Sequence, residues 1–201
     1  MESITVFYHR YLRHFLAKDD ATATPYDKYM ALSYAVRNQM VGKWIETQKQ
    51  YHASNLRRVY FISMEFMPGK SLHQNMVNLG LEENLTEVAM DLGVSLEQIF
   101  AEEHECELGN GSKGVLTACM QEAMATMGIP AMGYGLHYDY SLFRQEIRNN
   151  MQIERPFDWL HKGHPWETLR PEYACIINLN GKLQWEQGNS ASMRPVWHSY
   201  D

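Results

Sequence analysis

Three closely spaced glycines, Gly109, Gly111 and Gly114, mark the stretch of this sequence that is best suited to chemistry. Glycines let the backbone come close to a ligand, and the free N–H groups at the start of a helix face an anion. The spacing fits G-x-G-x-x-G, but a dinucleotide site needs a strand directly before it, and residues 102–107 are polar instead. A P-loop cannot be built from these glycines either, because the G-x-x-x-x-G-K-[ST] spacing is absent. The run therefore predicts a loop of unusual shape that either binds an anion or only begins a helix over residues 115–127.

The elements that must position this loop alternate between helices and strands. Thr24 as an N-cap and Pro25 at the first helical position predict a long amphipathic helix that ends before Asn55. The apolar run over residues 59–64 predicts a strand that is buried on both faces of a parallel sheet. Further helices are expected over residues 71–78, 82–92 and 96–104, the last capped by Ser95, and further strands over residues 132–138 and 173–179. This alternation indicates an α/β fold.

Composition narrows the class of protein. A chain of 201 residues with 45% hydrophobic and 21% charged residues is long enough for one domain with a real core. Its net charge of −6 argues against nonspecific binding of nucleic acid, which needs clustered lysines and arginines. Cys106, Cys119 and Cys175 are too scattered for a disulfide framework or a zinc site, so we expect free thiols. Because the sequence also shows no signal peptide and no membrane-spanning apolar run, we expect a cytoplasmic protein without a membrane partner.

Several blocks along the chain occur in the order found in one enzyme family. They are Ala23-Thr24-Pro25 followed by a helix through residues 41–45, then residues 59–66, 108–111, 125–128, 133–138, 158–160 and 163–167. In these blocks, over about residues 5–182, the chain resembles the N-terminal portion of the glycogen (α-glucan) phosphorylases. The resemblance implies an incomplete N-terminal part of a doubly wound domain, with a long first helix and a mostly parallel sheet. It also implies a truncated phosphorylase-like domain over residues 1–183 and a divergent tail without periodicity over residues 184–201.

What the resemblance implies about activity is cleavage of α-1,4-linked glucosyl units by phosphate, with pyridoxal phosphate as the cofactor. The lysine that holds this cofactor belongs to the C-terminal half of the family, which these residues do not include. We therefore expect no cofactor, no bound metal and no complete catalytic site in this chain alone, so that it is inactive by itself. The pattern of the family's regulatory nucleotide site is also not matched, because Lys49 and His52 replace its second glutamine and its tyrosine.

The family's active-site loop is matched by Asn110, Gly111 and Gly114, and a carboxylate that follows the first strand is matched by Glu65. A second interpretation of Glu65 remains open, in which the carboxylate only satisfies backbone amides at the end of a strand. The histidines His137, His161 and His164 are expected to form hydrogen bonds or lie at the surface rather than bind a metal, because no H-E-x-x-H spacing occurs.

The loop departs from the family pattern at four positions. Ser112 replaces a glycine and restricts the backbone if positive φ is required there, and Val115 replaces an arginine. Lys113 replaces a leucine and adds a cation, whereas Glu107 replaces a glycine and adds a negative charge near the loop. These changes together predict that anion binding is lost.

Three functions of different classes remain open. The first is a partial phosphorylase that has no activity alone. The second is a non-catalytic subunit that pairs with itself or with a full-length phosphorylase, through the segment that lies at the dimer interface in the family and here includes Arg13, His14, Lys18, Thr24 and Pro25. The third is a module that binds α-glucan through Trp159, Trp166 or Tyr134, although buried packing is the favoured role of each.

Overall fold

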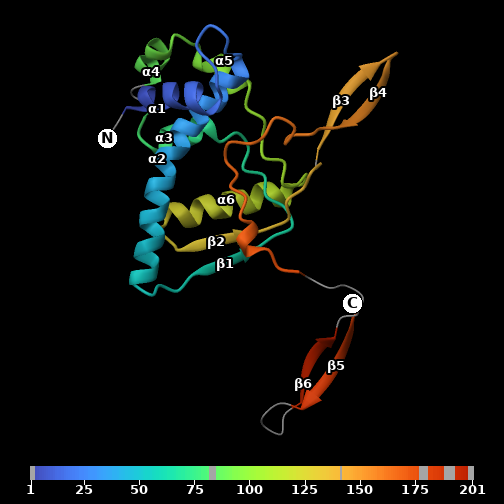
Figure 1. The fold of residues 1–201 in the computed structure, drawn as a ribbon. Coiled ribbons are helices and arrows are strands. Elements are labelled where there is room, and N and C mark those ends of the chain that lie inside the picture. The colour runs from blue at the N-terminus through green and yellow to red at the C-terminus, as the bar shows by residue number, and fades with distance from the viewer. Residues whose placement is uncertain (1–2, 82–84, 141, 177–180, 188–192, 199–201) are drawn as a thin grey trace. The chain divides into compact units, whose positions relative to one another are not determined.

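The computed structural model describes residues 3–81, 85–140, 142–176, 181–187 and 193–198 (Figure 1). The chain divides into two compact units, Met1–Trp166 and Glu167–Asp201, and each is described here by itself. Within the described residues, no helix has the length and apolar character that crossing a membrane requires.

Helices form the N-terminal half of the first unit. Helix α1 (Ile4–Arg10) continues into the π-helical segment η1 (Tyr11–Phe15), and the long helix α2 spans Pro25–Ala53. Thr24 and Asp27 form a reciprocal capping box at the start of α2, with Pro25 in the first turn. Asn55 has a positive φ of 46° just beyond the helix end. The start and the end predicted for this helix are therefore confirmed.

The main core of the first unit lies among these helices. Helices α3 (Leu72–Asn78), α4 (Leu85–Leu92) and α5 (Leu96–Ala101) gather around the first half of α2, whose second half extends away from them (Figure 1). The side chains with less than 1% exposure in this cluster include Tyr8, Leu12, Leu32, Val36, Leu72 and Met76. Helix α5 ends at Ala101 rather than at the predicted residue 104, and Ser95 stands at its N-cap position without a side-chain cap.

One polar atom in this core gives a testable prediction. The Tyr8 hydroxyl is buried without a hydrogen-bond partner in the described part of the chain. Its burial, together with the charge of Asp20, raises the pKa of Tyr8 from 10.0 to about 12. Because the unfolded chain loses this proton first, the stabilisation present below pH 10 disappears as the pH rises through about 12.

Replacement of Tyr8 by Phe is therefore expected to leave the free energy of unfolding unchanged or to raise it, by up to about 1–3 kcal/mol. The variant should also keep more of its stability than the wild type above pH 10. Urea titrations at neutral and at alkaline pH measure both effects, with the exposed Tyr140→Phe change as the control. A loss of stability in Tyr8→Phe at neutral pH, absent in the control, would show that the hydroxyl has a partner.

The second half of the first unit contains a β-α-β arrangement. Strands β1 (Val59–Ile62) and β2 (Ala131–Tyr134) pair in parallel, and helix α6 (Ser112–Thr126) precedes β2 and contacts it. Figure 1 shows α6 running alongside this pair. The α/β class is thus confirmed, with small parallel and antiparallel sheets, whereas a doubly wound sheet remains an inference from the resemblance.

The burial predicted for the first strand is wrong. Tyr60 and Ile62 are 58% and 82% exposed, although the strand is parallel as expected. The physical reason is that alternate side chains of a strand point to opposite faces of the sheet. Phe61 lies on the face of α6, because its register partner Gly133 is close to Gln121 of that helix. Tyr60 and Ile62 point to the opposite face, where they are exposed. The apolar residues of β1 consequently form a surface rather than a core.

Two antiparallel hairpins complete the described structure. Strands β3 (Phe143–Arg148) and β4 (Met151–Pro156) are joined by Asn149 and Asn150, whose φ angles of 51° and 60° suit a two-residue hairpin turn. In the second unit, a short 3₁₀ helix (Pro171–Tyr173) precedes strands β5 (Lys182–Gln187) and β6 (Met193–His198). The segment from residue 184 onward, which shows no periodicity in the sequence, thus contributes to a hairpin.

Several predicted boundaries need correction. The strand expected over residues 173–179 is absent from residues 173–176, and its remainder lies outside the described residues. The strand expected over residues 132–138 ends at Tyr134. The helix expected over residues 82–92 is described from Leu85 onward, because residues 82–84 lie outside the described part.

Candidate functional site

The candidate site forms where the chain that leaves β1 meets the glycine loop before α6. The Ser63 hydroxyl accepts a hydrogen bond from the Glu65 amide at 3.2 Å and donates one to the Glu65 carbonyl at 2.9 Å, so the chain turns tightly here. The next residue, Phe66, donates its amide to the Leu108 carbonyl at 2.9 Å in an isolated antiparallel bridge. The Thr117 hydroxyl of α6 also donates to the Glu65 carbonyl, at 2.6 Å. These contacts fix the Glu65 backbone beside the loop.

The Glu65 side chain contacts the loop directly. Its Oε2 atom accepts a hydrogen bond from the Gly111 amide at 3.0 Å. Gly111 occupies the N-cap position of α6, where the positive end of the helix dipole stabilises a negative charge. A backbone N–H of the loop that could bind an external anion is thus used by a carboxylate of the chain itself. Of the two interpretations of Glu65, this contact with a backbone amide is observed, and a role in an active site stays a prediction.

The loop glycines pack closely against the segment after β1, most tightly at Gly109. A Cβ atom at Gly109 would lie 2.6 Å from the Glu65 Cβ, and one at Gly111 would lie 2.9 Å from the Glu65 Oε2. A Cβ at Gly114 would meet the Cγ of Met67 at 2.8 Å. These distances explain the glycine spacing without a phosphate.

The departures from the family loop have less effect on the backbone than expected. Helix α6 begins at Ser112 rather than at residue 115, so Ser112 has helical geometry and no positive φ is needed there. Lys113 and Asn110 are exposed, and Val115 is half exposed on α6. The concern that Ser112 restricts the backbone is therefore wrong.

Glu107 has a partner of its own. The residue is 7% exposed, and its carboxylate accepts a hydrogen bond from the Leu142 amide at 3.3 Å. Burial raises the pKa of Glu107 above its usual value, partly offset by this hydrogen bond. The residue therefore fixes the chain before β3.

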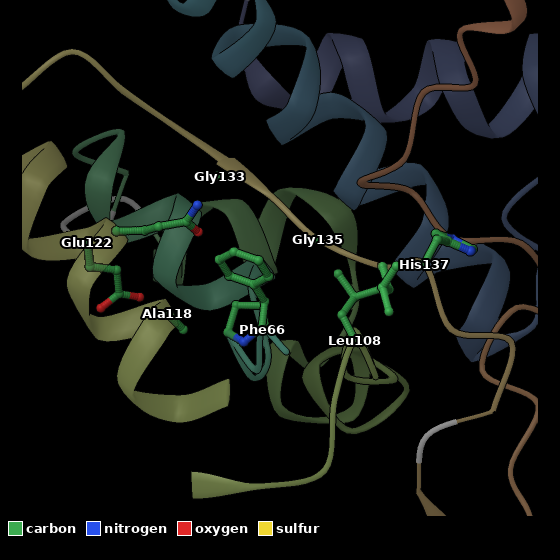
Figure 2. A pocket seen from close by; sticks show the side chains of 10 residues that line it. Phe66, Leu108, Ala118, Glu122, Gly133, Gly135 and His137 are labelled. Carbon is green, nitrogen blue, oxygen red and sulfur yellow. The ribbon is translucent and has the colours of Figure 1, made fainter. Parts of the chain in front are cut away.

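A cavity of about 380 Å³ lies next to this assembly. Its walls come from α6, from β2 and the residues after it, and from the Phe66–Leu108 bridge, and Figure 2 shows the Phe66 ring between Ala118 and Leu108. Gly135 is required here, because a Cβ atom would lie 2.8 Å from the Phe66 ring. The lining is mainly apolar, with Glu122 and His137 as its ionisable groups. The volume suits a small ligand, and no motif in the sequence indicates this cavity.

Comparison with known proteins identifies the family. Residues 89–201 match the family model described as carbohydrate phosphorylase. The chain belongs to this family. It is 42% identical over 177 residues to the brain form of glycogen phosphorylase from Rattus norvegicus and from Homo sapiens, and to the liver form from Bos taurus. The alignment covers 88% of this phosphorylase-family chain and 21% of each relative, so the chain spans about a fifth of the length of the curated relatives it matches.

The aromatic side chains proposed to stack on sugars take different positions in this phosphorylase-family chain. Trp159 is 2% exposed, and its Nε1 donates to the Tyr138 carbonyl at 3.0 Å. The Trp166 Nε1 donates to the buried carboxylate of Glu103 at 3.3 Å. Tyr134 is 51% exposed at the end of β2. Trp159 is therefore buried and Trp166 partly buried, in line with the packing role favoured for them, whereas the packing role favoured for Tyr134 is wrong because this side chain is exposed.

The three histidines also differ in environment. His161 is exposed near Asp158, His137 packs against the Trp159 ring, and His164 is 8% exposed. Among the described residues, no group of three or more His, Cys, Asp or Glu side chains is placed to hold a metal ion. The Nε2 atom of His164 lies 3.4 Å from the Sγ of Cys106, a contact that the sequence does not reveal because 58 residues separate the pair.

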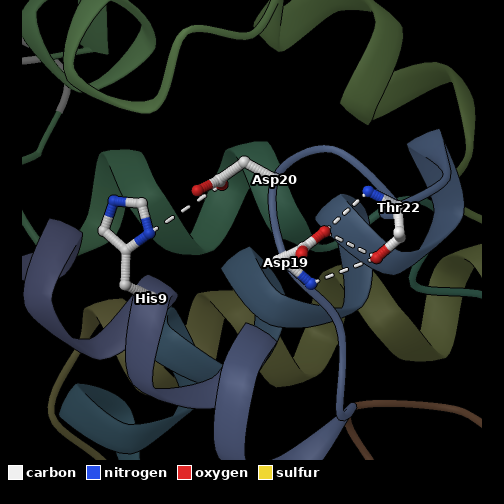
Figure 3. A network of polar contacts seen from close by, with 4 residues as sticks. All are labelled: His9, Asp19, Asp20 and Thr22. Atoms are coloured by element: carbon white, nitrogen blue, oxygen red, sulfur yellow. Dashed lines mark hydrogen bonds and ion pairs between the residues drawn. The ribbon is translucent and has the colours of Figure 1, made fainter.

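Short-range hydrogen bonds order the proposed interface segment. The Asp19 carboxylate accepts hydrogen bonds from the Thr22 amide at 2.8 Å and the Thr22 hydroxyl at 2.7 Å, and these bonds lower the pKa of Asp19 (Figure 3). His9 of α1 lies 3.9 Å from Asp20 in the same segment. Arg13 and His14 are exposed, and Lys18 is half-buried. The segment thus has a defined shape, and its role as an interface stays a prediction.

Phosphate is expected not to bind at the loop, and Lys113→Ala is expected to change nothing measurable. The reason is that Glu65 already accepts the Gly111 amide and places a negative charge at the helix start. Titration of the chain with inorganic phosphate, followed by NMR of the loop amides, tests this. Saturable binding at millimolar or lower concentration, weakened in Lys113→Ala by about 1 kcal/mol with the fold intact, would contradict it.

Proposed function

We propose that this chain forms the part of a carbohydrate phosphorylase that places Glu65 against the glycine loop, and that these 201 residues alone do not catalyse phosphorolysis. The observation that carries the proposal is 42% identity over 177 residues to glycogen phosphorylases. Glycogen and related α-glucans are accordingly the proposed substrates of the whole assembly in which this segment acts. A cytoplasmic location is part of the proposal and is supported by cysteines that form no disulfide.

The residues present do not fit the cofactor of the family. A lysine that forms an imine with pyridoxal phosphate is typically desolvated in a pocket. All eight lysines lie in the described part of the chain, and none of them is buried. None lines the cavity beside the loop. We therefore derive no catalytic step through pyridoxal phosphate in this chain.

The proposed role of the residues around Glu65 is to hold its carboxylate and its backbone in a fixed position. The carboxylate of Glu65 is held by the Gly111 amide, and its backbone is held by Ser63 and Thr117. Groups at a catalytic centre must be held within about half an ångström of their productive geometry. The four hydrogen bonds that hold Glu65 support such a positioning role.

The experiment that tests the proposal is an assay of the purified chain with glycogen, inorganic phosphate and added pyridoxal phosphate. We expect no release of glucose 1-phosphate and no absorbance of an imine, while a full-length glycogen phosphorylase in the same assay gives both. Borohydride treatment followed by peptide mass spectrometry checks each lysine for a pyridoxyl group. Release of product by the chain alone, or a stoichiometric pyridoxyl-lysine in it, would overturn the proposal.

A second candidate function is supported by a specific observation. Val41, Trp44 and Ile45 on the second half of α2 are 37%, 52% and 44% exposed, and exposed apolar patches mark protein interaction sites. We expect this surface and the segment over residues 13–24 to pair with a second copy or with a full-length phosphorylase. Co-elution of the tagged chain with a full-length glycogen phosphorylase tests the second partner, and separate elution at micromolar concentrations would exclude it. The buried Trp159 gives no comparable support to a glucan-binding module.

A further inference from the structure

We propose that Cys106 is a modification site, whose thiol is activated by His164 and reacts with electrophilic oxidants of the hydroperoxide class. The Sγ atom of Cys106 lies 3.4 Å from the Nε2 and 3.9 Å from the Nδ1 of His164. Cys106 is partly exposed, whereas the imidazole is 8% exposed. A neighbouring imidazole that accepts the thiol proton is the usual means by which proteins activate a cysteine.

The imidazole is held in place by its neighbours. The Trp159 ring packs edge-on against it, with 5.0 Å between the ring centroids. Trp159 is itself fixed by the bond from its Nε1 to the Tyr138 carbonyl. The residue after the histidine, Pro165, is fully buried, and its carbonyl accepts a hydrogen bond from Arg37 at 2.8 Å. His164 therefore keeps its place relative to the sulfur.

The thiol is positioned by its own segment. The Cys106 carbonyl accepts a hydrogen bond from the Leu108 amide at 3.0 Å, and the Leu108 carbonyl in turn accepts the Phe66 amide. The sulfur is thus attached to the segment that pairs with the backbone beside Glu65. The backbone from Cys106 to Leu108 is therefore held by hydrogen bonds.

The charges near the pair favour transfer of the proton to His164 over its loss to solvent. Glu105 and Glu107 flank the cysteine in sequence, and the buried Glu103 precedes them. Burial, the Glu103 carboxylate and, more weakly, Cys106 raise the pKa of Tyr29 on α2. His104, two residues before the cysteine, and Arg37 of α2, which donates to the Pro165 carbonyl, are further ionisable groups of this region. Carboxylates disfavour an isolated thiolate, but a thiolate beside an imidazolium leaves the net charge of the pair at zero.

The reaction balances without a further reactant. His164 accepts the thiol proton, and the thiolate attacks one oxygen of the hydroperoxide. An S–O bond forms and the O–O bond breaks, and the leaving alkoxide or hydroxide takes the proton from the imidazolium. Cys106 is oxidised by two electrons to a sulfenic acid, and the hydroperoxide is reduced to an alcohol or to water.

Iodoacetamide labelling of the intact chain across pH, read by peptide mass spectrometry, tests the activation. Cys119 and Cys175 are exposed and serve as controls in the same sample. We expect the rate at Cys106 to reach half its maximum at least about one pH unit below the controls. His164→Asn should remove this difference and slow labelling of Cys106 at neutral pH about tenfold, without effect on Cys119 or Cys175.

Treatment with hydrogen peroxide in the presence of a sulfenic-acid trap then tests the modification. We expect the trap adduct at Cys106 in the wild type and a lower yield of this adduct in His164→Asn. A pH midpoint for Cys106 equal to or above that of Cys119 would overturn the proposal, as would a profile that His164→Asn leaves unchanged while circular dichroism shows an intact fold. If His164→Asn unfolds the chain, the wild-type profile of the three cysteines decides by itself.

Discussion

Alanine in place of Gly109 is expected to lower the free energy of unfolding by about 1–3 kcal/mol, the usual effect of an overpacked site. The added Cβ would lie 2.6 Å from the Glu65 Cβ and 3.1 Å from the Glu65 Cα. Because a backbone atom is among these contacts, a new rotamer of Glu65 cannot relieve them. The loop and the segment after β1 must move apart, which weakens the 3.0 Å bond from Gly111 to Glu65. Urea denaturation at an unchanged m-value measures the loss.

The matched control for this substitution is Gly42→Ala. Gly42 lies within α2, and a Cβ there would meet nothing within 4 Å. Alanine at this helical position is expected to stabilise the chain by about 0.5–1 kcal/mol, because glycine loses more conformational freedom on folding. If Gly109→Ala lowers the free energy of unfolding and Gly42→Ala raises it, then the packing around each glycine determines the effect of the added methyl group. Equal stability of Gly109→Ala and the wild type would mean that the loop does not pack against Glu65 in solution.

The helix boundaries that the sequence predicted well depend on local chemistry. Thr24, Pro25 and Asp27 lie within one turn, so their capping pattern can be read directly and the start of α2 is confirmed. The start of α6 was placed too late because no Ser, Thr, Asp or Asn stands at the N-cap, which is Gly111. Glu103 supplies a comparable cap at the start of α3, where its carboxylate accepts the Ser71 and Leu72 amides from more than thirty residues away. A cap from so far along the chain leaves no local signal.

In the candidate site, too, contacts between residues that are distant in sequence leave no local signal. The hydrogen bond between Gly111 and Glu65 joins residues 46 positions apart. The family resemblance assigns both residues to one active-site region, but neither the resemblance nor the spacing of residues predicts this contact. Burial of β1 was predicted from its apolar residues, but burial also depends on what covers a strand, and Ile62 is 82% exposed. The contact of Cys106 with His164 depends on how two distant segments pack, and neither residue alone indicates it.

Self-association of the chain is the second large effect that we expect. Val41, Trp44 and Ile45 follow the three- and four-residue spacing that places side chains on one face of a helix. All three side chains are exposed. In the described structure, β1 and β2 also form a sheet of two strands, so each strand has one unpaired edge. An unpaired edge and an apolar helix face both favour contact with another chain. Light scattering at micromolar concentration should therefore report dimers or larger particles, with binding of a dye for apolar surface at low concentration.

The double variant Trp44→Lys, Ile45→Lys tests which surface is responsible. Removal of a central tryptophan anchor typically costs an interface about 2 kcal/mol, so the dissociation constant should rise about thirtyfold. Leu169→Lys, at a side chain that is 88% exposed in the second unit, serves as the control and should leave association unchanged. Association that persists in the double variant would place the contact elsewhere, with the β1–β2 edges as the next candidate. A compact wild-type monomer that unfolds cooperatively and binds no dye would contradict the prediction itself, because the apolar face of α2 would then be stable in water without a partner.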